Sequence, residues 1–420
     1  MHHRPPELDL RASALRRGAA FLAASALLVF TAAARAVAAD SPIAPAPFAG
    51  GKLSIQSRLR WEYADQDNLR DSNAFTLRTR LGFTSAPFDG WQAMIEGENT
   101  AILGPSENYN AAGTNPGGAG RTVIADPPVT DVNQAWLSYT ALDATLKGGR
   151  QRLVLDNARF VGDSGWRQNM QTFDAATLSA KPGKDVSLFY GYVWRVSRVY
   201  GDKPGQPDFK SRSHLLNLSY GGWSAGKLTA YAYLLDFRNS AANSSATYGA
   251  SFVGAAPVSR DVKLTYRAEY ATQHDAGNNP VRYSADYGDA EIGVAVAAWD
   301  FGLGCEVLGS DGGGKGFATP LATLHAFDGW ADLFLATPAR GLRDTFASIG
   351  FGAAGTFPTR LVYHDFRSDN GSFDYGREWD AQISHKLGRF WTVLAKAAHY
   401  DGKPPYFDTD RLWLQTEFSF

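Results

Sequence analysis

Residues 411–420 read RLWLQTEFSF, and their side chains alternate strictly between two faces. One face carries Leu412, Leu414, Thr416, Phe418 and Phe420, and the other carries Arg411, Trp413, Gln415, Glu417 and Ser419. Because successive side chains of a β-strand point to opposite sides, this pattern predicts a strand with one apolar and one polar face. Chain ends are usually frayed and polar, so a final strand that ends on phenylalanine is unusual. The alternative is the last strand of an ordinary soluble β-protein.

The same alternation is present near the start of the chain, in residues 54–63 and 75–84. The polar faces of these two stretches carry the arginines Arg58, Arg60, Arg78 and Arg80. In a soluble sandwich these arginines would cover the solvated exterior. In a membrane barrel they would line the lumen while the apolar face meets lipid. The alternation in a single strand does not distinguish a soluble sandwich from a membrane barrel. The number of strands and the connections between them must decide.

Alternating stretches continue along the chain at hairpin spacing, about 18 of them, an even number within the range of single-chain outer-membrane barrels. Residues 262–272 form one of the clearest, with Lys263 and Arg267 on the polar face. Short turns alternate with Gly- and Pro-rich connections such as 105–128 and 309–316, as membrane barrels require. No fixed repeat period is present, which argues against a secreted β-solenoid, the main rival together with a sandwich.

We therefore predict an all-β fold, a transmembrane antiparallel β-barrel of about 18 strands that occupies residues 53–420 and lies in the bacterial outer membrane. The first and last strands both alternate, so they can pair and leave no open edge. Apolar residues make up 44% of the chain and aromatic residues 13%. This abundance of aromatic side chains suits the girdles that membrane barrels carry at both interfaces.

Other features of the composition exclude several classes of protein. Beyond the N-terminus there is no run of about 18 apolar residues, so the chain is not a helical membrane protein. A net charge of -1 excludes a strongly basic nucleic-acid binder. The single cysteine, Cys305, cannot form an internal disulfide.

Residues 1–39 have the features of a cleaved signal peptide. A basic start that includes Arg16 and Arg17 precedes a short apolar segment, residues 19–33, and small residues then offer a cleavage site. We expect a Sec signal rather than a twin-arginine signal, because no matching context surrounds the arginine pair. Residues 40–52, rich in Pro, Ala and Gly, are predicted to be a flexible spacer.

Two stretches are not explained by alternation. They are GRQR at residues 149–152, with the segment that follows it, and TPLATLHAFDGWAD at residues 319–332. Together with HDF at 364–366 and EWDA at 378–381, they resemble the alginate-export family of outer-membrane porins. The resemblance extends over most of the predicted barrel. Members with a different substrate share this pattern, so the family name does not establish the cargo.

The resemblance implies an electropositive constriction that passes an anionic polysaccharide such as alginate. It makes Arg150 and Arg152 candidate constriction residues, and Arg340 and Arg343 weaker ones. A guanidinium can bind a carboxylate bidentately, and passage requires each such site to be weak enough for release. We predict that the following residues line the pore and bind substrate: Arg58, Arg60, Arg78, Arg80, Arg150, Arg152, Lys263 and Arg267.

The predicted lumen is not purely basic. The acids that share its face are Glu62, Glu96, Glu98, Glu269, Glu306, Glu378, Asp380 and Glu417. Inward arginines can therefore pair with these acids and stiffen the wall instead of selecting anions. This leaves two alternatives to an anion channel: a general small-solute porin with a mixed-charge lumen, or a closed structural or binding barrel.

We expect no enzyme activity, no cofactor and no metal. Ser213 and His214 lie on opposite faces of one predicted strand, so they cannot act together as a catalytic pair. The histidines lack the spacing of metal ligands. The expected partners are outer-membrane lipid and lipopolysaccharide, an anionic solute, and the barrel-assembly machinery, which reads a C-terminal aromatic such as Phe420 in similar barrels.

Overall fold

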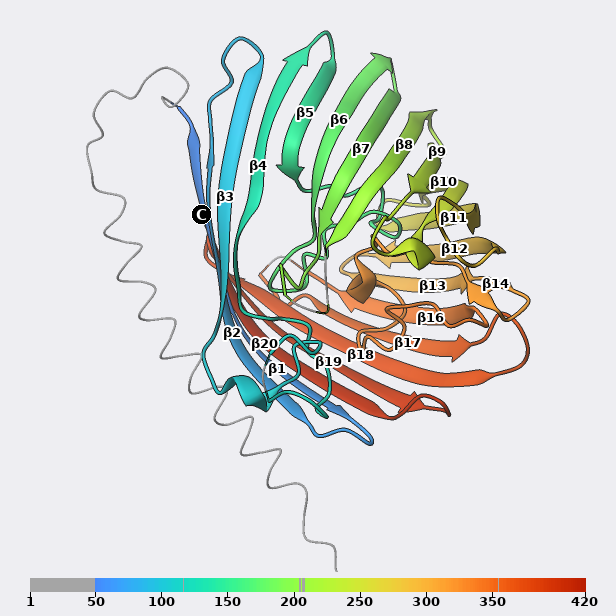
Figure 1. The fold of residues 1–420 in the computed structure, drawn as a ribbon. Helices are drawn as coiled ribbons and strands as arrows, with labels where there is room; N and C mark the ends of the chain where they lie inside the picture. Colours follow the sequence, from blue (N-terminus) through green and yellow to red (C-terminus); the bar gives the residue numbers. More distant parts are fainter. Residues whose placement is uncertain (1–49, 116, 204, 206–207, 354) are drawn as a thin grey trace, which may run out of the picture.

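Eighteen β-strands form one antiparallel sheet that closes into a barrel in the computed structural model (Figure 1). The structure describes residues 50–115, 117–203, 205, 208–353 and 355–420. The predicted signal peptide, residues 1–39, lies outside the described residues, as does the predicted spacer except for its last three residues, 50–52. The fold is the one that strict alternation predicts.

The barrel closes between its first and last strands. Strand β1 (Lys52–Gln66) pairs with β2 (Ser72–Thr84) on one side and with β20 (Thr409–Ser419) on the other. The backbone N–H of Ile55 donates to the carbonyl of Phe420 at 3.1 Å, and the N–H of Phe420 donates back to Ile55 at 2.9 Å. These pairings give both terminal strands two neighbours, so neither leaves an open edge.

The strands between these two pair in chain order. They are β3 (Trp91–Ile102), β4 (Val129–Ala141), β5 (Ala144–Gln151), β6 (Thr172–Gly183), β7 (Val186–Ser197), β8 (Phe209–Trp223), β9 (Gly226–Leu235), β10 (Ser245–Pro257), β11 (Val262–Asp275), β12 (Ser284–Val296), β13 (Trp299–Leu308), β16 (Leu342–Phe351), β17 (Thr359–Arg367), β18 (Asp374–Leu387) and β19 (Trp391–Gly402).

Short elements lie in the connections. They are the hairpin of β14 (Ser310–Asp311) and β15 (Lys315–Gly316), and the 3₁₀ turns η1 (Ser106–Asn108), η2 (Ala241–Asn243) and η3 (Leu324–Ala326). Within the described part of the chain, no helix is long and apolar enough to span a bilayer.

The two ends of the barrel differ in their connections. Residues 142–143, 184–185 and 224–225 are tight turns at one end, the short-turn end, where β1 begins and β20 finishes. The long connections, 103–128, 152–171 and 309–341, all leave the opposite end, the long-connection end (Figure 1). This is the asymmetry of a transmembrane barrel.

The polarity of the two faces is the reverse of that of a soluble protein. Leu81, Ile95 and Leu303 face outward and are each more than half exposed. Arg60 and Glu378 face inward and are fully buried. An apolar exterior around a charged interior fits a barrel in lipid and excludes the sandwich alternative, whose apolar face would be covered.

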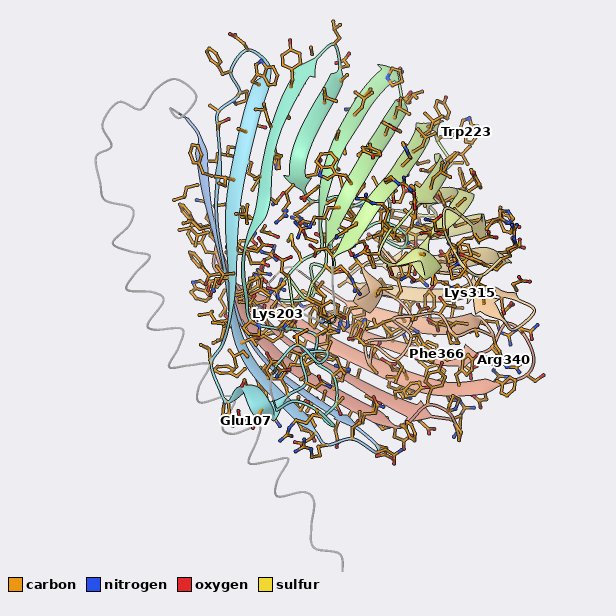
Figure 2. All side chains as sticks on the ribbon, viewed as in Figure 1. Glu107, Lys203, Trp223, Lys315, Arg340 and Phe366 are labelled. Atoms are coloured by element: carbon orange, nitrogen blue, oxygen red, sulfur yellow. The ribbon has the colours of Figure 1, made fainter. Side chains whose placement is uncertain are left out.

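The packed interior lies inside the barrel, where the long connections fold inward. Residues 158–162 run beside residues 321–323, joined by a parallel bridge between Val161 and Leu321 and by the bond from the N–H of Thr323 to the carbonyl of Ala158 at 3.0 Å. Phe160 packs against Tyr287 of the wall, with ring centroids 5.2 Å apart. Figure 2 shows side chains crowding the space that the strands enclose.

Candidate constriction inside the barrel

Arg58 and Arg78 face each other across β1 and β2 as direct cross-strand neighbours. Arg58 Nε donates to a carboxylate oxygen of Glu417 on β20 at 2.7 Å, and Arg78 Nη2 lies 3.5 Å from the other oxygen of the same carboxylate. Arg78 is fully buried, and none of its three guanidinium nitrogens has a hydrogen-bond partner within the described structure. Two guanidinium groups therefore share one carboxylate, which leaves an excess of positive charge at this point of the wall.

Arg60 and Arg80 extend this group along the same face, and both also hold connections that fold inward. Arg80 Nε donates to Glu98 on β3, while Arg80 Nη2 donates to the carbonyl of Gln168 at 3.4 Å. Arg60 Nη2 donates to the carbonyl of Trp166 at 2.7 Å, and its guanidinium lies 4.2 Å from the centre of the Trp166 ring. Arg60 also forms an ion pair with Asp126 at 3.3 Å. These arginines fix residues 126 and 166–168 against β1 and β2.

The basic residues predicted on β11 lie at different depths. Arg267 forms ion pairs with Glu269 and with Asp289, the latter at 2.8 Å. Lys263 shares this inward face but is exposed, near the short-turn end of the strand. Arg267 is thus part of the paired wall, whereas Lys263 lies near the mouth of the barrel.

Arg150 and Arg152 do not lie together, although both belong to the GRQR motif. The register of β5 places Arg150 on the face that carries the exposed Leu146, which is the outward face. There it forms ion pairs with Asp174 at 2.8 Å and with Asp131 at 3.3 Å. Arg152 follows the last residue of β5, is half exposed, and donates from Nε to Asp163 of the inward connection at 2.9 Å.

A second cluster surrounds Lys396, which faces inward from β19 and is almost fully buried. Its Nζ lies 3.6 Å from the ring centre of Trp330 and 4.2 Å from that of Trp166. The same Nζ is 2.7 Å from Nε2 of His325. Trp166 stacks on His325 with ring centroids 4.5 Å apart. Lys396 therefore ties two inward connections, 152–171 and 309–341, to the wall.

The hydrogen bonds of His325 define its protonation state. An ammonium has only donors, so Nε2 of His325 accepts from Lys396. Nδ1 then carries the proton and donates to Asp332 at 2.8 Å. Burial and the facing Lys396 charge lower the pKa of His325 well below its ordinary value. His325 is therefore neutral at pH 7, with a defined tautomer.

Carboxylates of β18 hold the adjacent part of the same connection. Glu378 accepts from the backbone N–H of Ala331 at 2.7 Å, and Asp380 accepts from that of Trp330 at 3.1 Å. Arg411 of β20 donates to the carbonyl of Ala331 at 2.8 Å. The TPLATLHAFDGWAD segment is thus fixed inside the barrel by side chains from three neighbouring strands, β18 to β20.

The arginines predicted to line the pore are paired with carboxylates. Each of the seven predicted arginines, Arg150 included, lies within ion-pair distance of at least one carboxylate. The pairing that the inward acids predict is therefore present. At the Arg58–Arg78 pair two guanidinium groups share one carboxylate, so the local balance favours positive charge.

The alternating pattern identifies the strands that carry Lys396 and Arg411, but it does not identify the groups that these two side chains contact. The sequence shows that both side chains face inward, whereas their partners come from connections far away in the chain. Arg159, which lies in the 152–171 connection and forms ion pairs with Glu306 and Asp328 at 2.7 and 2.9 Å, gave no periodic signal.

Ser213 and His214 lie on opposite sides of the barrel wall. Ser213 faces inward and bonds Ser211 at 2.7 Å, whereas His214 faces outward and bonds Tyr190 at 2.8 Å. The predicted separation of Ser213 and His214 is therefore confirmed. Among the residues that the structure covers, no group of three or more His, Cys, Asp or Glu side chains is arranged to hold a metal ion.

The model of the alginate export family matches residues 51–283, more than half of the chain. No curated protein matches the chain in sequence.

Several solved structures share the fold. OccK9 (OpdG) of Pseudomonas aeruginosa superimposes with a TM-score of 0.71 at 14% identity, covering 90% of this chain and 100% of that one. OpdK of the same organism, solved with vanillate, gives 0.69 at 14% identity over 88% and 98% of the two chains. OccAB4 of Acinetobacter baumannii gives 0.67 at 15% identity over 88% and 98%. At these identities the likeness shows the fold alone.

Proposed function

This chain belongs to the alginate export family, and on that premise we propose that it forms a passive outer-membrane channel for anionic solutes, with an anionic polysaccharide such as alginate as the first candidate. The family and the fold are those of outer-membrane porins. The short-turn end then faces the periplasm and the long-connection end the cell exterior.

The observation that carries the proposal is the Arg58–Arg78 pair. Like charges directly opposite each other on a sheet are destabilising, and within the described structure Glu417 is the carboxylate that both guanidinium groups reach. A uronate carboxylate can bind a guanidinium bidentately and then be released to the next one. Arg80 and Arg60 continue the row on the same two strands. Arg152, Arg267 and Lys263 complete the proposed lining, while the outward register of Arg150 removes it from the lining.

A second candidate is a porin for small carboxylates with a mixed-charge lumen. The ion pairs of Arg80, Arg152 and Arg267 favour it, because paired walls hold fewer free positive charges. The fold-related OpdK was solved with vanillate, a small carboxylate. The inward connections 152–171 and 309–341 narrow the interior, which favours a small solute over a wide polymer path.

The test is single-channel conductance in a planar bilayer under a salt gradient, with the reversal potential recorded. We expect anion selectivity in the native protein. In the triple variant R58Q/R78Q/R80Q the anion-to-cation permeability ratio should fall by at least about threefold, because the loss of even one unit charge at roughly 6 Å in water changes the energy of a passing ion by ~0.7 kcal/mol. Arg212→Gln, on the outward face, is the matched control and should change nothing.

The outcomes separate the candidates. Block of the anion current by oligouronates supports the polysaccharide channel, whereas block by vanillate alone supports the small-carboxylate porin. A folded triple variant with native selectivity would refute the role of these three arginines. Cation selectivity or absence of current in the native protein would refute the anion channel itself.

A further inference from the structure

The outer wall carries a group of arginines at the long-connection end, on three neighbouring strands. Arg343 of β16 and Arg367 of β17 are direct cross-strand partners, and Arg377 of β18 is the partner of Asp365 on β17. Arg343 is exposed, and the side chains of Arg367 and Arg377 are each about half exposed. We call Arg343, Arg367 and Arg377 the outer arginine patch.

The charges of this patch are incompletely matched. Arg367 and Arg377 both form ion pairs with Asp365, at 2.7 and 3.5 Å. Within the described structure Arg343 has no ion pair, although it faces Arg367 directly across the sheet. Two further carboxylates lie alongside, Asp374 opposite Arg367 and Asp401 opposite Arg377. Asp401 is itself paired with Lys403 at 3.5 Å.

Three other outward arginines, on strands at this end of the barrel, are matched. Arg212 pairs with Asp236 at 2.9 Å, and Arg195 pairs with Asp202 and Asp208. Arg150 has Asp131 and Asp174. The pair of Arg343 and Arg367 therefore differs from its counterparts around the wall, because opposed like charges destabilise a sheet unless an anion lies between them. Figure 2 places Arg340 at the same end of the barrel, where its guanidinium lies 4.4 Å from the Phe373 ring centre.

An apolar surface lies directly below the patch on the same strands. Tyr363 and Trp379 form a lateral aromatic pair with ring centroids 4.8 Å apart. Leu361 and Ile383 continue this outward face toward the short-turn end and are exposed. Positive charge above an aromatic and aliphatic wall is the shape of a site for a lipid with an anionic headgroup.

We propose that the outer arginine patch binds a phosphate group of the phosphorylated glycolipid of the outer leaflet, lipopolysaccharide. The phosphate lies between Arg343 and Arg367, whose forked donors match phosphate oxygens, with Arg377 completing the contact. The acyl chains run along Tyr363, Trp379 and Leu361. This site is on the outside of the barrel and is independent of the solute path.

The test uses the purified full barrel in detergent and native mass spectrometry with bisphosphorylated lipid A as the probe. We expect retained lipid A on the native protein and a loss of apparent affinity of at least about tenfold in R343Q/R367Q, the scale set by basic residues that face anionic headgroups. Dephosphorylated lipid A should bind the native protein as weakly as the phosphorylated form binds this variant. Arg212→Gln, an outward arginine with its own carboxylate, is the control and should retain native affinity.

Folding is checked by the shift in gel mobility on heating, and R343K/R367K provides a second variant that preserves charge. We expect this lysine variant to bind lipid A with intermediate affinity. Native affinity in folded R343Q/R367Q, or an equal loss in R212Q, would overturn the proposal. So would equal retention of dephosphorylated lipid A, because acyl chains alone would then account for binding. Displacement of lipid A by millimolar inorganic phosphate would show a site for free phosphate instead.

Discussion

Lys396 Nζ on the barrel wall lies 2.7 Å from Nε2 of His325 on an inward connection. This bond continues through Nδ1 of His325 to Asp332, which also forms an ion pair with Arg167 of the other inward connection. A single buried chain of donors and acceptors therefore joins β19 to both connections. The position of the connections inside the barrel depends on it.

Replacing Lys396 by methionine should loosen the connections. The change keeps the length of the side chain but leaves His325 without its donor and Asp332 nearby without the lysine charge. We expect the free energy of unfolding to fall by about 3 kcal/mol, the cost of breaking a buried charged network by removing one partner. Chemical denaturation measures this, and single-channel recordings should show noisier current.

Lys386→Met is the matched control, since Lys386 is an exposed lysine on the neighbouring strand β18. It should leave both stability and current noise unchanged. Equal effects of the two substitutions would mean that loss of a lysine, rather than of the Lys396 contacts, is responsible.

Stability should depend on pH through His325. Its pKa in the folded protein is lowered below the ordinary 6.5 by burial and by Lys396. The unfolded chain then binds a proton that the folded chain excludes, so stability is lost as pH falls below 6.5. Between pH 6.5 and pH 5 we expect a loss of at most about 2 kcal/mol from this group, since one pH unit corresponds to about 1.4 kcal/mol.

Denaturation midpoints at the two pH values give this difference, and H325N should remove most of it. Asparagine places its amide near the position of Nδ1, where it can donate to Asp332, and it does not titrate. A pH dependence that persists in full in H325N would assign the effect to other buried groups.

Removing the carboxylate between Arg58 and Arg78 should increase anion selectivity. Glu417→Gln leaves two guanidinium groups without their shared acid, so the local field becomes more positive. We expect the anion-to-cation permeability ratio to rise by about threefold, the same electrostatic scale as the loss of one unit charge. The reversal potential measures it. Asp410→Asn, on the outward face beside His399, should leave the ratio as it is.

Arg150 and Arg152 should behave differently despite their shared motif. Arg150→Gln removes an outward ion pair and should not change the reversal potential, because its charge lies on the far side of the wall. Arg152→Gln removes a half-exposed charge beside the inward connection and should lower anion selectivity. Conductance of both single variants under one salt gradient decides this. An effect of Arg150→Gln equal to that of Arg152→Gln would contradict the register assigned to β5.

Alternation was sufficient for the strands whose two faces contrast along their full length. The alternation in residues 186–197 predicts a strand with these bounds, and β7 has them. By contrast, the alternation in residues 291–298 predicts a strand there, whereas β12 begins at Ser284, seven residues earlier. The outward residues of that extension, such as Asp286 and Gly288, are polar or small because they lie beyond the apolar band. Because the outward face of this part of β12 is not apolar, its sequence shows no alternation of apolar and polar residues.

The candidate site was predicted only as a set of inward charges. The alternation of side chains placed Arg58, Arg78 and Glu417 on the inward face of the barrel. It did not show that the carboxylate of Glu417 pairs with both arginines. The inward folding of 152–171 was not predictable, because its contacts are with residues as distant as Leu321 and Asp328. Arg150 and Arg152 are two positions apart, so the prediction placed both on the inward face of the barrel. However, β5 ends at Gln151, and the chain turns inward there.

The pairing of Ile55 with Phe420 has a consequence for how the molecule is made. The first strand cannot acquire its second neighbour until β20, the last strand, has been synthesised and carried across the inner membrane. Throughout that journey β1 would present an unpaired row of backbone donors and acceptors, which invites aggregation. Closure of the barrel between β1 and β20 is therefore a late event in its biogenesis.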